Sequence, residues 1–69
     1  MTFEDYMEEI RKINSELGDI AERTMKQAAL GIANASNSGF VALMRQHANL
    51  TKRSHQLTEA MMKQLEIDN

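Results

Sequence analysis

The chain has 69 residues, no cysteine, no proline and a formal net charge of −2. This length allows one small domain with a modest core, and the lack of cysteine excludes disulfides and metal sites made of thiolates. The small net charge does not indicate nucleic acid or any other charged partner. Good helix formers dominate and valine occurs once, so we expect a single all-α domain over residues 1–69.

A first helix is predicted over about residues 3–34. Thr2 can cap it, and Asp5 follows three positions later in a pattern close to a capping box. Apolar residues then recur at alternating steps of three and four, the heptad a/d pattern of a helix that packs along one seam: Phe3, Tyr6, Ile10, Ile13, Leu17 and Ile20. Beyond Ile20 the stripe drifts by one position, through Ala21, Met25 and Ala28, as a straight helix requires.

The middle of the chain carries no charge from Gln27 to Met44. A membrane-spanning helix needs about 20 predominantly apolar residues, whereas this run contains turn and cap formers: Asn34, Ser36, Asn37, Ser38 and Gly39. We therefore predict a bend at about residues 35–39. Any of residues 36–38 can cap the next helix, and either asparagine can end the first helix in a left-handed conformation. The alternative is one continuous helix that forms a long coiled coil, which glycine and asparagine disfavour.

A second amphipathic helix is predicted over about residues 40–66, with its apolar positions again at helical spacing. Folding the chain about residue 37 pairs Leu17 with Leu57 and Ile13 with Met61, so a positions of one helix meet d positions of the other. The expected fold is a two-helix antiparallel hairpin. A lone hairpin leaves its e positions in water, which favours dimerisation into a four-helix bundle.

Two sets of residues follow from this architecture. The predicted core comprises Phe3, Ile10, Ile13, Leu17, Ile20, Met25, Phe40, Leu43, Leu50, Leu57, Met61 and Leu65. The predicted surface for self-association or for a partner comprises Met7, Ile13, Leu17, Ile20, Met25, Ala28, Phe40, Leu43, Met44, His47, Leu50, Leu57, Met61 and Leu65.

Polar residues interrupt both stripes near the middle of each helix: Thr24, Gln27, His47 and Ser54. They either form a hydrogen-bonded layer that fixes register and oligomeric state, or they lie partly exposed. In the first case, titration of His47 makes association depend on pH. His55 and Glu59 are one helical turn apart, but two outward residues fit a solvated pair better than a metal site. We expect no metal and no cofactor.

No catalytic or nucleotide-binding motif occurs, so we expect no enzyme. We predict a small non-enzymatic interaction module (an adaptor, regulator or chaperone) that acts through a self-associating helical hairpin and binds another protein. One alternative is a structural subunit that polymerises into a larger helical assembly, such as a secretion or filament component. The other is a dimeric RNA- or DNA-binding hairpin. The sparse basic patch of Arg45, Lys52 and Arg53 on a net acidic chain argues against nucleic acid.

Charge is unevenly distributed along the chain. Residues 1–22 carry seven acids and two bases, whereas residues 45–63 carry four bases and one acid, so the two parts attract each other if the chain folds back. The opening sequence MTFEDYMEE has acids where a secretory signal needs bases, and no apolar region follows. We therefore expect a cytoplasmic protein without a membrane span.

Overall fold

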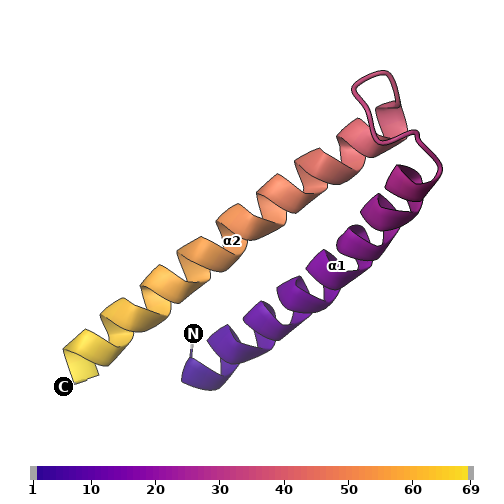
Figure 1. Cartoon of the computed structure of the whole chain (residues 1–69). Helices are drawn as coiled ribbons and strands as arrows, with labels where there is room; N and C mark the ends of the chain where they lie inside the picture. The colour runs from indigo at the N-terminus through magenta and orange to yellow at the C-terminus, as the bar shows by residue number, and fades with distance from the viewer. Residues whose placement is uncertain (1, 69) are drawn as a thin grey trace.

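The computed structural model describes residues 2–68, and two helices make up most of them (Figure 1). Helix α1 runs from Phe3 to Ala29, and helix α2 runs from Ser38 to Asp68. The two helices lie side by side in opposite directions, joined at one end by the loop of residues 30–37 (Figure 1). Residues 2–68 contain no strand. The prediction of an all-α helical hairpin is therefore confirmed.

Helix α1 begins with the capping box that the sequence predicts. The backbone N–H of Asp5 donates to the Thr2 hydroxyl at 3.2 Å, and the backbone N–H of Thr2 donates to the Asp5 carboxylate at 3.0 Å. These bonds satisfy two backbone donors that the first turn of a helix leaves unpaired. The backbone bond from Thr2, together with the Thr2 side chain, lowers the pKa of Asp5 because it favours the charged carboxylate.

Helix α1 ends at Ala29, before the predicted boundary near residue 34. Gly31 adopts a φ of 75°, its N–H donates to the Ala28 carbonyl, and the next N–H, of Ile32, donates to the Gln27 carbonyl, both at 3.0 Å. This pair of bonds around a left-handed glycine is a Schellman motif, which terminates a helix. The prediction that Asn34 or Asn37 adopts the left-handed conformation is wrong, because no non-glycine residue among residues 2–68 has a positive φ.

Asn37 connects the two helices through its side chain. Its Oδ1 accepts from the backbone N–H groups of Gly39 at 3.0 Å and Phe40 at 3.3 Å. Asn37 therefore caps α2, and it is one of the three residues predicted as candidates for this cap. Its Nδ2 donates to Gln27 Oε1 at 3.0 Å and to the Ile32 carbonyl at 2.9 Å. One side chain therefore holds the last turn of α1, the loop and the first turn of α2 together.

The early end of α1 changes how the helices are paired. The loop is centred near residues 33–34, midway between Ala29 and Ser38, and α2 begins slightly before the predicted residue 40. Gln46 shares a cavity with Ile20 and Arg23, whereas folding about residue 37 would place it beside Ala28. The pairing predicted about residue 37 is therefore wrong, because Gly31 ends α1 well before that point.

The core is a single narrow seam between α1 and α2. Its buried members all occupy heptad d positions: Ile13, Ile20, Leu43 and Leu57. Several other predicted core residues are only half-buried: Ile10, Leu17, Phe40, Leu50 and Met61. Phe3, Met25 and Leu65 are 42%, 71% and 43% exposed, so the single chain does not bury these three predicted core residues. Two helices have one seam, and no other element of residues 2–68 covers the residues beside it.

Candidate interaction surface

The heptad positions of both helices define a surface without charged side chains. Counting Phe3 and Phe40 as a positions, no a, d or e position from residue 3 to residue 65 holds Asp, Glu, Lys or Arg. The d positions form the buried seam. We call the a and e positions together the uncharged face: Phe3, Met7, Ile10, Asn14, Leu17, Ala21, Thr24, Ala28, Phe40, Met44, His47, Thr51, Ser54, Thr58, Met61 and Leu65.

The uncharged face lies on one side of the hairpin. Neighbouring residues are about 100° apart around a helix, so the a and e positions lie together, next to the d position. When two antiparallel helices turn their d positions toward each other, their a and e positions come to the same side of the pair. The uncharged face therefore extends over both helices along most of their length.

The structure sorts the predicted interface residues into three groups by burial. The seam buries Ile13, Ile20, Leu43 and Leu57. Half-buried are Leu50, at a d position of the seam itself, and four residues beside the seam: Leu17, Phe40, Met44 and Met61. The remaining predicted members are exposed: Met7, Met25, Ala28, His47 and Leu65. All of the exposed members belong to the uncharged face except Met25, which lies at its edge at a b position.

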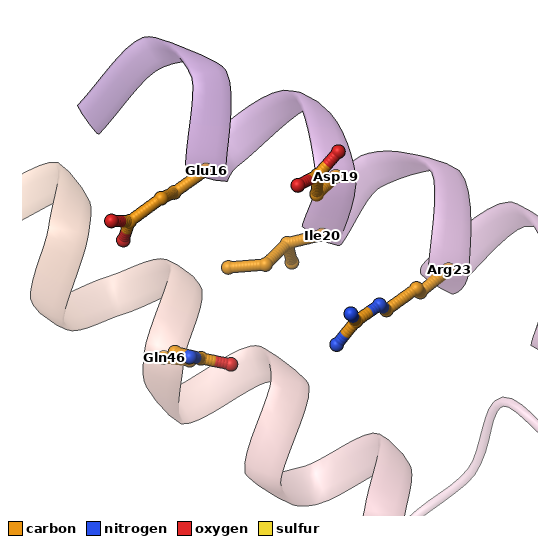
Figure 2. A pocket seen from close by; sticks show the side chains of 5 residues that line it. All are labelled: Glu16, Asp19, Ile20, Arg23 and Gln46. Carbon is orange, nitrogen blue, oxygen red and sulfur yellow. The ribbon is translucent and has the colours of Figure 1, made fainter. Parts of the chain in front are cut away.

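The opposite side of the hairpin is polar. Glu16, Asp19 and Arg23 of α1 and Gln46 of α2 surround Ile20 and line an open cavity of about 290 Å³. Figure 2 shows Glu16 and Arg23 reaching from α1 toward α2 on either side of Ile20. These four polar residues occupy c and g positions, on the other side of the seam from the uncharged face. The two sides of one hairpin therefore differ sharply in charge.

The polar residues near the middle of the helices do not form a layer between α1 and α2. The Thr24 hydroxyl donates to the Ile20 carbonyl of its own helix at 2.8 Å, and Gln27 Oε1 accepts from Asn37 in the loop. His47 is exposed. In the single chain, partial exposure is therefore the correct one of the two interpretations, and a pH-sensitive layer around His47 requires a second chain.

Ion pairs contribute little to the hairpin. His55 and Glu59 form the expected solvated pair, with 3.1 Å between Nε2 and Oε1, and Arg11 lies 3.8 Å from Glu8. Both pairs are exposed and lie within one helix, where such pairs are worth about 0.3–0.5 kcal/mol. Within residues 2–68, no three His, Asp or Glu side chains come together as metal ligands. Neither helix, over the same residues, is long and apolar enough to cross a membrane.

Charge is also separated along the length of the hairpin. In sequence order the chain divides into an acidic first part and a basic later part, and that division does not reveal this separation. Residues 23–58 contain five bases and no acid, whereas the rest of the chain contains ten acids and three bases. Because the chain folds back, the last turns of α1 and the first turns of α2 lie together at the loop end, and the first turns of α1 and the last turns of α2 lie toward the other end (Figure 1). The loop end is therefore basic and the terminal end acidic.

Comparison of this chain with protein-family models, with curated proteins and with solved structures found no match. The functional argument therefore rests on three properties of the hairpin itself. These are the uncharged face, the polar side opposite it, and the separation of charge between the loop end and the terminal end.

Proposed function

We propose that the chain is a small non-enzymatic interaction module that self-associates through the uncharged face into a four-helix bundle. The observation that carries this proposal is the absence of charge from every a, d and e position between residues 3 and 65. A hairpin that acts alone needs only its a/d seam free of charge, and its e positions tolerate charged side chains. Uncharged e positions that include exposed Met7 and Leu65 are typical of helices that pack against a second layer.

The small core of the single chain also supports self-association. Only four side chains of the described residues are buried, and a chain of this size rarely builds a sufficient core alone. A second chain placed on the uncharged face would cover Phe3, Met7 and Leu65, which are 42%, 45% and 43% exposed. Burial of a fully exposed apolar side chain is worth about 1.5–3 kcal/mol, so each of these three would gain about half of that or less.

Binding of a further protein is the second part of the proposed function. Met25 and Met62 are exposed at the edge of the uncharged face, and Leu30 and Ile32 are exposed at the loop end. Exposed apolar residues often mark protein-binding sites, and methionine adapts to partner surfaces of different shape. An adaptor, regulator or chaperone uses contacts of this kind.

Two other functions remain as proposals, each with a feature in its favour. A polymerising structural subunit is favoured by exposed Leu30 and Ile32, which offer a second contact at the loop end. A dimeric nucleic-acid-binding hairpin is favoured by residues 23–58, which carry five bases and no acid. Mass that grows with concentration beyond the dimer supports the polymerising subunit. Binding to RNA or DNA that weakens steeply with salt supports nucleic-acid recognition.

The test is the solution mass, measured by light scattering after size exclusion over a hundredfold range of concentration. We expect about twice the 7.8 kDa of one chain. Ala21→Lys places a charge at an exposed e position on the uncharged face and should give a monomer, because the ammonium group would be buried without a partner. Ser15→Lys is the matched control, since Ser15 is exposed at an f position of the same helix, and this variant should stay dimeric.

Three results would contradict the proposal. The first is a wild-type chain that is monomeric at every concentration. The second is a dimer that Ala21→Lys leaves intact. The third is equal loss of the dimer in Ala21→Lys and Ser15→Lys, which would mean that the uncharged face is not the contact.

A further inference from the structure

We infer that the second copy packs antiparallel to the first, with the loop end of one hairpin beside the terminal end of the other and a two-fold axis beside Gly18 of α1. This inference rests on the proposed function and adds to it the arrangement of the two chains. Three properties of the hairpin support it: the size of its broad side, the lengthwise separation of charge, and the open space around Gly18.

The broad side of the hairpin is large enough to carry a dimer interface. It measures 51 × 17 Å between Cα atoms, a projected area of about 870 Å² for the whole side, and each partner of a standard interface buries ~800 Å² of accessible surface. A single partner helix is only about 10–12 Å wide and would leave one of the two apolar stripes uncovered. A second hairpin of the same shape covers both stripes.

The lengthwise charge separation decides between the two ways in which a second copy can lie on the face. A parallel dimer would place both basic loop ends together and both acidic terminal ends together. An antiparallel dimer places the base-only region of each chain beside the acid-rich region of the other. Charge complementarity of this kind selects the orientation of partners more than it adds affinity, and it acts over about 8–10 Å at ordinary ionic strength.

Gly18 lies near the middle of α1 and has no explanation within the single chain. Glycine inside a helix costs about 1 kcal/mol relative to alanine, and a Cβ at Gly18 would meet nothing within 4 Å. In the antiparallel dimer, α1 lies against the partner's α1, and Gly18 comes next to its own copy at the two-fold axis. The missing side chain there allows the two backbones to approach closely.

The same axis pairs the e positions of α1. Met7 lies opposite the partner's Ala28, and Asn14 lies opposite the partner's Ala21. At each crossing a small side chain faces a larger one, which suits close packing between the helices. In a parallel dimer, Met7 instead lies opposite Thr58, the nearest e position of the partner's α2. The two orientations therefore predict different neighbours for one residue.

Cross-linking of single-cysteine chains tests the arrangement, and the native chain has no cysteine to interfere. Met7→Cys chains are mixed with Ala28→Cys chains in one sample and with Thr58→Cys chains in another, and both samples are oxidised mildly. A disulfide needs Cα atoms within about 7 Å. We expect the mixed Met7–Ala28 disulfide to form at least tenfold faster than the Met7–Thr58 disulfide, and faster than either Met7→Cys or Ala28→Cys alone.

The outcomes separate failure of the inference from failure of the proposed function. A dimer by light scattering in which Met7→Cys cross-links to Thr58→Cys is parallel, which overturns the inference and leaves the function standing. A dimer in which neither mixture cross-links has its axis elsewhere and also overturns the inference. A wild-type chain that scatters as a monomer contradicts the function itself. Rapid formation of the Met7–Ala28 disulfide in a dimeric sample supports both.

Discussion

The loop and the helical body of this hairpin are stabilised in different ways. The loop is complete within one chain: Gly31 closes α1 through a Schellman motif, and Asn37 makes hydrogen bonds to both helices and to the loop. Among the described residues, the helical body buries only four side chains and leaves an uncharged face in water. The position at which the chain folds back is therefore determined by hydrogen bonds within the chain, whereas the core between the helices stays small.

The largest effect is expected for a substitution in the seam of the helical body. Ile20 is 4% exposed, and Ile20→Ala should lower the free energy of unfolding by about 2–5 kcal/mol through lost burial and a cavity. The measurement is urea unfolding followed by circular dichroism at one fixed protein concentration. Met25→Ala is the matched control on the same helix, since Met25 is mostly exposed, and it should change the free energy by less than about 0.5 kcal/mol. Equal costs for the two variants would contradict the single-seam core.

A smaller effect is expected in the loop, from Asn37→Ala. This variant loses the cap of α2 and the two bonds to Gln27 and Ile32, so the free energy of unfolding should fall by about 1–3 kcal/mol. Asn37→Asp separates the two roles, because aspartate keeps the accepting oxygen of the cap and loses the amide donor. We expect Asn37→Asp to fall between the wild type and Asn37→Ala in urea unfolding. An Asn37→Ala chain as stable as the wild type would show that Asn37 does not hold the helices together.

Substitution of Gly31, at the end of α1, should lower the free energy of unfolding less than Asn37→Ala does. Gly31→Ala forces a side chain into a left-handed backbone conformation, which costs about 1–2 kcal/mol. Gly31→Asn should cost less, because asparagine tolerates this conformation better than alanine does. The same unfolding measurement checks the order of the two variants. If neither Gly31 variant lowers the free energy of unfolding, then the Schellman motif does not define the end of α1.

The sequence is sufficient to predict the local features of this fold. The steps of three and four from Phe3 to Ile20 predict the amphipathic helix, and the spacing of Thr2 and Asp5 predicts its capping box. The end of α1 is harder to predict, since Gly31 and two asparagines are all able to adopt a left-handed conformation. The choice depends on bonds from Asn37 to Gln27 and Ile32, which lie ten and five residues away along the chain. The pairing of the helices follows from that choice.

The candidate surface could be predicted in part. Spacing alone identifies the e positions, Met7 and Leu65 among them, and the structure leaves these two exposed. The spacing of His47 fits either a polar layer or partial exposure, and His47 is exposed in the single chain. The order of charges along the sequence does not reveal the basic loop end, because this end combines the last turns of α1 with the first turns of α2.

The smallest predicted effect concerns the first turn of α1, at the end farthest from the loop. Hydrogen bonds from Thr2 lower the pKa of Asp5 below its usual value of 3.8, so the folded state favours the carboxylate. The contribution of the capping box is therefore fully present above about pH 3.8 and is lost as the pH falls through the lower pKa of the folded state. Titration of the Asp5 carboxyl carbon by NMR checks this, and a midpoint at or above 3.8 would contradict it. Thr2→Ala, which keeps the backbone bond and removes the hydroxyl, should move the midpoint only part of the way back, because the backbone bond is the larger cause.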